Sequence, residues 1–198
     1  MEQFELKNPI LINGEECKAL AYDTSKLTVE QYIDATAKGG LASNKIMEVN
    51  AHLHFLLGAY AIVNASENVI DISDVERVSG KDIVNITQIG RNMFHSDGTV
   101  QISEDTITFS QPLKFKGGAK KKLKYDFDSI TTEQFNSAYD SGGFATNKVM
   151  ELNDAFHLFL GIYAIINANT NIKFDELKGQ LTGKNLLAVV TLGRNFFS

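Results

Sequence analysis

The chain has 198 residues, of which 43% are hydrophobic and 22% are charged, an ordinary balance for a folded globular protein. Its net charge of −5 argues against nucleic acid as the main partner, because a phosphate-binding domain normally carries a basic surplus. Cys17 is the only cysteine, so no disulfide can form within the chain, and a reducing compartment fits best.

The sequence gives no sign of export or of membrane insertion. Residues 1–5 are acidic where a signal peptide would be basic, and no apolar core follows them. The longest apolar stretches, 53–63 and 155–166, have about a dozen residues each, whereas a membrane-spanning helix needs about 20. We therefore expect a cytoplasmic protein that does not enter a membrane.

The sequence contains an internal repeat. When it is shifted by 103 positions, Pro9 falls on Pro112 and the two halves align without a gap. About 33 of the 86 aligned pairs are identical, and apolar positions mostly stay apolar while they change identity, as core sites do. We expect two tandem modules, residues 1–94 and 106–198, joined by a polar linker at 95–105.

Each module should begin with a β-hairpin. The hairpins turn at Asn13-Gly14 and at Gly117-Gly118. Apolar residues alternate along both arms of the second hairpin: Ile107, Phe109, Leu113, Phe115, Leu123 and Tyr125. Pro9 and Pro112 cannot donate a ladder hydrogen bond, so the strand that holds each proline should be an edge strand or should carry a bulge there.

The first helix of each module should begin at Thr28 and at Thr131. The Thr-x-x-Gln spacing lets the hydroxyl group cap an N–H of the first turn while the glutamine reaches back. Both helices should end at a glycine pair, 39–40 and 142–143, because glycine readily adopts the left-handed conformation that follows a helix.

A long central helix should follow, from the caps Ser43 and Thr146 for about 20 residues to Asn64 and Asn167. One apolar row comprises Ile46, Val49, Leu53, Leu56, Tyr60 and Val63, matched by Val149, Leu152, Phe156, Phe159, Tyr163 and Ile166. A second row comprises Ala51, Phe55, Gly58 and Ile62, matched by Asp154, Leu158, Gly161 and Ile165. A helix that is apolar on two sides is buried on two sides.

The second row is the candidate partner-binding surface. One side of the helix can take the module's other helices, so the other side must face the sister module, another subunit or a client. Gly58 and Gly161 each cost about 1 kcal/mol in a helix interior, so we expect them to permit close approach of a neighbouring backbone. The predicted partner-binding residues are Phe55, Gly58, Ile62, Leu158, Gly161 and Ile165.

Two further helices should complete each module. The expected ranges are 74–78 and 175–180 for the short helices and 81–94 and 184–197 for the last ones. Ser73 and Glu76 have the spacing of a capping box, and linker residues 99–102 could pair as a short extra strand. The predicted fold is α+β, mainly α. It consists of two tandem repeats, each a β-hairpin followed by about four helices with one long central helix, packed with pseudo-twofold symmetry.

No motif points to catalysis, a cofactor or a metal. His52 and His54 are two positions apart, on different sides of a helix, so they cannot hold one metal ion together. Lysine replaces Cys17 in the second module, so we do not expect Cys17 to be a nucleophile. Gly80-Lys81 resembles the end of a phosphate-binding loop but lacks the upstream glycine and the following Ser or Thr, so a helix start fits better.

A polar set recurs in both modules: Asn44, Lys45, Glu48, Asn50, Arg91 and Asn92, matched by Asn147, Lys148, Glu151, Asn153, Arg194 and Asn195. These residues either cap helices and fix tertiary structure, or form a polar rim around an interface.

The same features follow one another in both modules. In the first module they are residues 6–10 (Leu-Lys-Asn-Pro-Ile), Gly14, Leu20, the helix start at Thr28, the long central helix, residues 72–75, residues 80–82 and Phe94. In the second module they are Pro112-Leu113, Gly117, Leu123, Thr131, residues 183–185 and Phe197. This order resembles the tail assembly chaperones of tailed phages and prophages. The likeness covers almost the whole chain twice.

The resemblance implies a non-enzymatic factor that acts in the host cytoplasm. It would bind the helical tape measure protein, or another phage tail protein, before the tail tube polymerises. Such proteins are commonly single modules that self-associate. Fusing two copies would turn the homodimer interface into an internal interface with a pseudo-twofold axis. Whether the fused protein also forms homo-oligomers stays open. Two alternatives also stay open: a structural component of a phage-like tail or tube, and a helical adaptor or ligand-binding module unrelated to phage.

Overall fold

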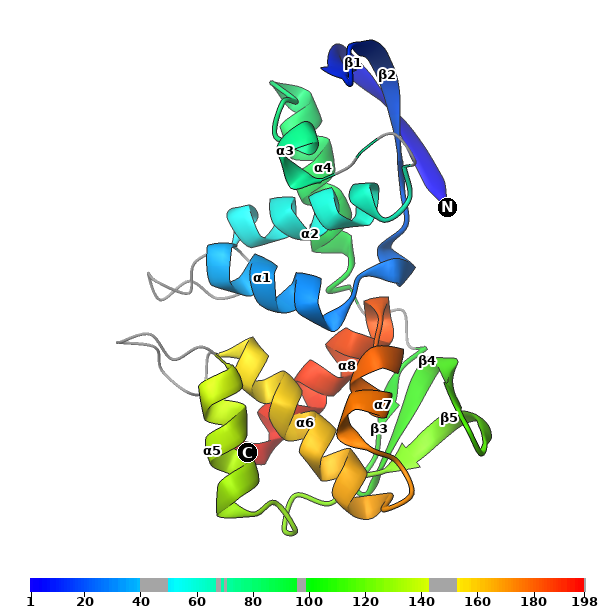
Figure 1. Ribbon diagram of the computed structural model, residues 1–198, viewed down its shortest axis with the longest axis vertical. Helices are drawn as coiled ribbons and strands as arrows, with labels where there is room; N and C mark the ends of the chain where they lie inside the picture. The colour runs from blue at the N-terminus through cyan, green and yellow to red at the C-terminus, as the bar shows by residue number, and fades with distance from the viewer. Residues whose placement is uncertain (40–49, 67–68, 70, 96–98, 143–152, 198) are drawn as a thin grey trace.

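The computed structural model describes residues 1–39, 50–66, 69, 71–95, 99–142 and 153–197. The fold is α+β, with helices packed beside two small antiparallel sheets. Figure 1 shows the two halves of the chain one above the other along the long axis, with the first hairpin at the upper end. The predicted class, α+β and mainly α, is therefore confirmed.

The first half opens with the predicted hairpin. β1 (Glu2–Ile12) pairs antiparallel with β2 (Glu15–Tyr22). The two residues between them, Asn13 and Gly14, have φ values of 53° and 85°. A two-residue hairpin turn of type I′ needs positive φ at both positions, and Asn-Gly is the pair that adopts it most readily.

The sheet of the second half has a third strand. β4 (Thr106–Phe115) pairs antiparallel with β5 (Gly118–Lys124), as predicted. β3 (Gln101–Ile102), from the linker, pairs with the other edge of β4. The extra strand expected within residues 99–102 is thus confirmed.

Each strand that contains a proline has an irregular register. The pairing of β1 with β2 shifts between Glu5 and Ile10, the segment that includes Pro9. The pairing of β4 with β5 shifts in the same way across Pro112. Proline has no N–H to give to the ladder, and the irregular register at both prolines agrees with the prediction of an edge strand or a bulge there.

Backbone N–H groups in this irregular segment bond to a side chain near the start of the last helix. The Asp82 carboxylate accepts from the N–H groups of Lys7 and Asn8 at 3.1 Å. Asn185 Oδ1 accepts from the N–H of Ser110 at 2.9 Å. The residue that follows each Gly-Lys pair therefore ties the hairpin to a helix, which agrees with the helix start preferred over a phosphate-binding loop.

α1 (Val29–Gly39) and α5 (Thr132–Ser141) begin where predicted. Thr131 Oγ1 accepts from the N–H of Gln134 at 3.2 Å, and Gln134 Oε1 accepts from the N–H of Thr131 at 3.1 Å. The same reciprocal pair stands at the start of α1. Both capping boxes are confirmed.

The glycines that end these two helices are not left-handed. α1 ends at Gly39, and α5 ends at Ser141 with Gly142 as its C-cap, so the predicted helix ends are confirmed. Gly142 has φ of −70°, and Gly39 is not among the residues with positive φ, so neither takes the left-handed conformation. The second glycine of each pair lies outside the described residues. Space explains glycine here, since a Cβ on Gly39 would lie 2.9 Å from Leu53 Cα, and one on Gly142 would lie 3.1 Å from Phe156 Cα.

The central helices begin later than predicted. Their bounds are Ala51–Val63 for α2 and Asp154–Ala168 for α6. The predicted caps, Ser43 and Thr146, lie outside the described residues, and the observed N-caps are Asn50 and Asn153. The prediction of a helix of about 20 residues with caps at 43 and 146 is therefore wrong.

Asn50 is the N-cap because it satisfies two helix ends at once. Its Oδ1 accepts from the N–H of Leu53 at 3.1 Å, and its Nδ2 donates to the carbonyl of Gly39, the last residue of α1, at 2.8 Å. Asn153 makes the same two bonds in the second half. Of the recurring polar set, these two asparagines therefore take the capping role. Residues 44–48 and 147–151 lie outside the described part of the chain.

The remaining helices are α3 (Ile72–Val75), α4 (Lys81–Asn92), α7 (Phe174–Gln180) and α8 (Gly183–Arg194), with 3₁₀ turns η1 (Thr24–Lys26) and η5 (Asn195–Phe197). The cap of α3 is Asp71, whose carboxylate accepts from the N–H of Ser73 at 2.7 Å. The capping box predicted for Ser73 and Glu76 is wrong, because the helix already begins at residue 72.

The contacts between the two halves are one-sided. The carbonyl of Leu27 accepts from the N–H of Gly183 at 3.0 Å, and the Tyr32 hydroxyl donates to the Asp154 carboxylate at 3.1 Å. The first half contributes its η1–α1 region, with α1 against α6 and η1 against α8, while α5, the counterpart of α1, has no comparable contact with α2 among the described residues. A twofold axis would pair equivalent elements reciprocally, so these contacts give no support to the predicted pseudo-twofold.

Candidate protein-binding face

The residues predicted to bind a partner lie mostly inside the protein. Buried are Gly58, Ile62, Leu158, Gly161 and Ile165, while Phe55 is half-buried. The last helix of the same half buries most of this row, because α2 packs against α4 and α6 packs against α8. A partner could reach this row only if those helices moved away.

The two glycines show how closely the helices cross. A Cβ on Gly58 would lie 2.1 Å from the carbonyl oxygen of Ile86 in α4, and one on Gly161 would lie 2.4 Å from that of Val189 in α8. The close backbone approach predicted at both glycines is confirmed, and the neighbour is the chain's own last helix.

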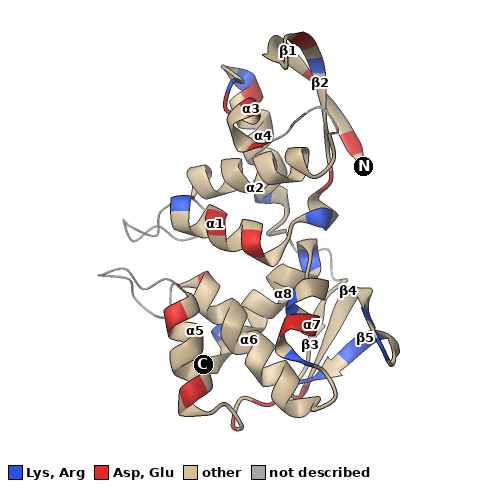
Figure 2. Ribbon diagram, in the orientation of Figure 1, with Lys and Arg blue, Asp and Glu red and all other residues tan. Residues whose placement is uncertain are grey.

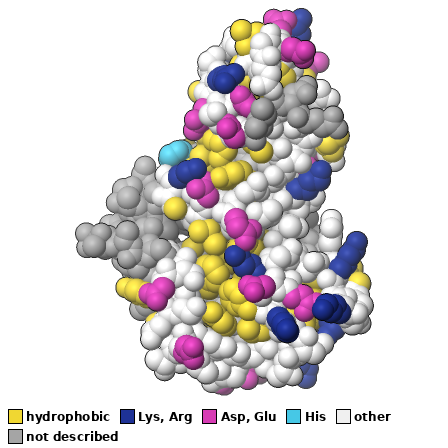
Figure 3. Space-filling view, viewed as in Figure 1, with side chains coloured by type: hydrophobic (Ala, Val, Ile, Leu, Met, Phe, Trp, Pro, Cys, Tyr) yellow, Lys and Arg dark blue, Asp and Glu magenta, His cyan; other side chains and the backbone are white. Residues whose placement is uncertain are grey.

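The other apolar row of the central helices reaches the surface. Tyr60 and Val63 of α2 are half-buried, and so are their counterparts Tyr163 and Ile166 of α6. Figure 3 shows hydrophobic side chains gathered along both helices on one face of the molecule. Charge is scarce here: in Figure 2 both helices are almost wholly tan, α2 has no charged residue, and Asp154 is the one carboxylate of α6. We call these four half-buried residues the apolar strips.

A groove of about 490 Å³ lies beside the strip of the first half. Its apolar lining is Leu56, Tyr60, Val63 and Ile72, and its polar lining is Lys38, Asp71, Ser73 and Glu76. A lining that combines apolar and charged side chains suits a segment that is apolar on one side and polar on the other.

Tyr60 is fixed in this groove by a short hydrogen bond from its hydroxyl to the Asp34 carboxylate. Burial, together with this bond, raises the pKa of Tyr60 above its usual value, so the phenol keeps its proton. Partial burial alone would raise the pKa of Asp34, but the hydrogen bonds from Lys38 and Tyr60 outweigh it and lower that pKa. Lys38 Nζ lies 2.8 Å from the same carboxylate. The groove thus presents a neutral aromatic ring beside a closed ion pair.

In the second half, aromatic rings stack along the strip. Phe174 lies parallel to Phe159, with ring centroids 5.9 Å apart and an interplanar angle of 4°, and its centroid is 5.0 Å from that of Tyr163. The Tyr163 hydroxyl donates to Ser137 Oγ at 3.0 Å. Such rings offer a rigid apolar contact surface with a polar tip.

An ion pair joins the two halves: Lys178 Nζ of α7 lies 2.9 Å from Glu30 Oε1 of α1. The hydrogen bond from Lys178 is the main reason that the pKa of Glu30 lies below its usual value. Glu30 is exposed and Lys178 is half-buried, so the pair adds little stability by itself.

One buried polar cluster was not foreseen from the sequence. Asp154 accepts from Arg194 Nε at 2.9 Å and from Arg194 Nη2 at 2.8 Å, in addition to the bond from Tyr32 of the other half. His157 Nδ1 lies 3.3 Å from the same carboxylate. The signal was present, because Asp154 interrupts an apolar row in which the first module has alanine, and Arg194 belongs to the recurring polar set.

The two equivalent histidines of the central helices pack against aromatic rings. His54 and His157 are buried, with ring centroids 5.3 Å and 5.8 Å from those of Phe94 and Phe197. Within the residues that the structure describes, no group of three or more His, Cys, Asp or Glu side chains could hold a metal ion. No helix in that same part of the chain has the length and hydropathy to cross a membrane.

Comparison of the chain with protein-family models, with curated proteins and with solved structures finds no match.

Proposed function

We propose that this chain is a non-enzymatic tail assembly chaperone that holds a helical stretch of the tape measure protein along the apolar strips of α2 and α6. The strips replace the buried second row as the binding surface. The observation that carries the proposal is that equivalent residues, 103 positions apart, are apolar and only half-buried. Figure 3 shows hydrophobic side chains gathered over both helices on one face of the molecule.

The physical reason is the solubility of the client. A long helix with an exposed apolar stripe aggregates unless that stripe is covered, and a groove of apolar side chains with a polar edge is the usual cover. In this proposal each of two repeats presents one strip. A client helix that is long enough to contact both strips binds more tightly than a helix that contacts one strip, because the second contact forms at high local concentration.

The test is a titration with helical fragments of the tape measure protein from the same genome, each carrying one tryptophan. The chain itself has no tryptophan, so the fluorescence change reports the fragment alone. Val63→Asp and Ile166→Asp should each lower the affinity about tenfold, because each places a charge where the client's apolar stripe would lie.

The matched control is Val84→Asp on α4. This substitution makes the same chemical change at a residue that is 64% exposed and lies outside the strips, so it should leave fragment affinity unchanged. Circular dichroism melting curves identify any variant that merely unfolds. The proposal fails if no fragment binds at micromolar concentration, or if Val84→Asp weakens binding as much as Ile166→Asp. Recovery of the protein in finished tails would favour the structural-component alternative instead.

A further inference from the structure

The second hairpin carries a positive charge that the rest of the chain does not share. Residues 106–124 contain six lysines and no aspartate or glutamate, a charge of +6. The whole chain has a net charge of −5, so its other residues together carry −11 (−5 minus 6). Figure 2 shows basic residues along β5, at the outer side of the lower half. The six are Lys114, Lys116, Lys120, Lys121, Lys122 and Lys124.

These lysines face solvent. All are exposed except Lys120, which is half-buried, and none of the six forms an ion pair within the part of the chain that the structure describes. Lys122 and Lys124 stand on either side of the buried Leu123, so both point away from the core. Strand residues two apart lie about 7 Å from each other, within the screening length of about 8 Å at physiological salt. The lysines therefore repel one another and favour a negatively charged neighbour.

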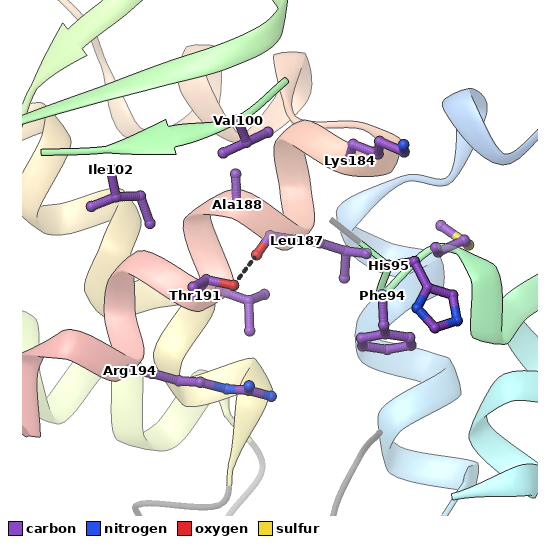
Figure 4. Close-up of a pocket in the computed structure, with 11 residues that line it drawn as sticks. Phe94, His95, Val100, Ile102, Lys184, Leu187, Ala188, Thr191 and Arg194 are labelled. Carbon is purple, nitrogen blue, oxygen red and sulfur yellow. Dashed lines mark hydrogen bonds between the residues drawn. The ribbon is translucent and has the colours of Figure 1, made fainter. Parts of the chain in front are cut away.

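β5 is also an edge of its sheet. The strand order is β3-β4-β5, so one side of β5 pairs with β4, and no strand among the described residues pairs with its other side. The opposite edge, β3, has two residues and lies beside α8: Ile102 and the adjacent Val100 line a cavity of about 290 Å³ with Ala188 of that helix (Figure 4). The long open edge is therefore β5, with seven residues whose backbone N–H and C=O groups can pair with an added strand.

Lysines on an edge strand commonly serve to keep other strands away, and the first hairpin shows how few that task needs. β2 is an edge as well, because its sheet has two strands. The positions that match the six lysines hold one lysine, Lys18, whose Nζ lies 3.1 Å from Glu16 Oε2. The other five hold Leu11, Asn13, Cys17, Ala19 and Ala21. Protection of an edge therefore does not account for the five additional lysines.

The hairpin is held firmly on the rest of the second half. Leu123 of β5 is buried in the same apolar cluster as residues of β4 and α8. Two further bonds hold β4 to α7: the N–H of Lys114 donates to Gln180 Oε1 at 3.1 Å, and the N–H of Lys116 donates to Glu176 Oε1 at 3.4 Å. A strand that is already fixed in place loses little conformational freedom when a second strand binds it.

We propose that β5 binds an acidic, extended segment of a partner protein, which adds to the sheet as a further strand with its carboxylates beside Lys120, Lys122 and Lys124. Carboxylates on alternate residues of such a segment match the spacing of these lysines, because side chains repeat every second residue in both strands. Seven strand residues span about 24 Å, so a short segment stays on the hairpin and avoids the negative remainder of the chain. The open edge favours a peptide over a nucleic acid, since a phosphodiester backbone has no N–H group to offer it.

Fluorescence anisotropy tests the proposal with the full chain and a fluorescein-labelled peptide, Glu-Val-Glu-Val-Glu-Val-Glu. The dissociation constant should lie below about 100 µM at about 50 mM salt and should rise at about 300 mM salt, where charges are screened. Lys122→Glu should weaken binding about fivefold, because it places a like charge beside the peptide. The matched control is Lys18→Glu, which makes the same change in net charge at an exposed lysine of the other edge strand and should leave the affinity unchanged.

A second peptide, Glu-Pro-Glu-Pro-Glu-Pro-Glu, separates strand addition from plain charge attraction. It carries the same charge but lacks three N–H groups and cannot form a regular strand, so it should bind at least tenfold more weakly, by about the loss of its ladder bonds. Equal affinity for the two peptides overturns the proposal, as does a wild-type chain that binds neither at about 1 mM.

Two other results also overturn it: a loss of affinity in Lys18→Glu as large as in Lys122→Glu, and tighter binding of a seven-nucleotide oligothymidylate than of the first peptide, which would make nucleic acid the partner. Lys124→Glu serves as a second β5 variant, and circular dichroism confirms that each protein is folded. The outcome is separate from that of client binding, because Lys122 lies outside the apolar strips and Lys122→Glu should leave the affinity for tape measure fragments unchanged.

Discussion

Gly58→Ala probes the crossing of α2 and α4, which buries the row first expected to bind a partner. The new Cβ would lie 2.1 Å from the carbonyl oxygen of Ile86, whereas ordinary contact begins near 3.4 Å, so the helices would have to separate by about 1.3 Å (3.4 minus 2.1). Both atoms are held by helix backbone and cannot rotate away. Overpacking of this kind costs about 3 kcal/mol at the upper end, and alanine returns about 1 kcal/mol of helix propensity. The net loss should be about 2 kcal/mol.

Urea denaturation followed by far-ultraviolet circular dichroism measures this loss as a lower unfolding midpoint. Gly179→Ala is the matched control, because Gly179 lies in α7 with no atom within 4 Å of an added Cβ. That variant should gain about 0.5 to 1 kcal/mol. If Gly58→Ala is as stable as the wild type, α2 and α4 do not cross so closely, and the row containing Gly58 would again be open to a partner.

Three further predictions concern the contacts that fix the fold. Tyr32→Phe should cost about 1 to 2 kcal/mol in urea denaturation, because the buried Asp154 carboxylate loses a donor from the other half; an unchanged midpoint would contradict that bond. Asn153→Ala should cost about 1 to 2 kcal/mol through loss of the α6 cap, and a loss well under 0.5 kcal/mol would argue for another helix start. Glu30 has a lowered pKa in the folded protein, so its contribution to stability is present above its unfolded pKa and is lost as the pH falls through the folded value. Lys178→Met should therefore lower the urea midpoint slightly near neutral pH, and the difference from wild type should vanish in acid; a difference that persists there would exclude the ion pair as its cause.

The local features of the fold could be predicted from the sequence because local chemistry determines them. Asn13-Gly14 sets a hairpin turn, Thr131 with Gln134 sets a helix start, and Pro9 sets an irregular register. Each of these features is determined by interactions within a few residues, so it can be predicted without knowing which distant residues pack against it.

The failures arose where distant contacts decide between local options. Ser43 is a good cap by composition, but Asn50 caps α2 and also bonds to the end of α1, a link between two helices that no local pattern reveals. Gly58 indicated a close neighbour, yet periodicity cannot say whether that neighbour is the chain's own helix or a foreign one. The buried Asp154 cluster likewise depends on Tyr32, which is 122 residues away.

The most direct test of client binding is photocrosslinking in cells that assemble tails. A benzoylphenylalanine at Tyr163, in the strip of α6, should form an adduct with the tape measure protein on irradiation. The same group at Val84, outside the strips, should form none with that protein. Adducts with the tape measure protein from position 84 but none from position 163 would contradict the account, since the client would then lie on a different face of the molecule.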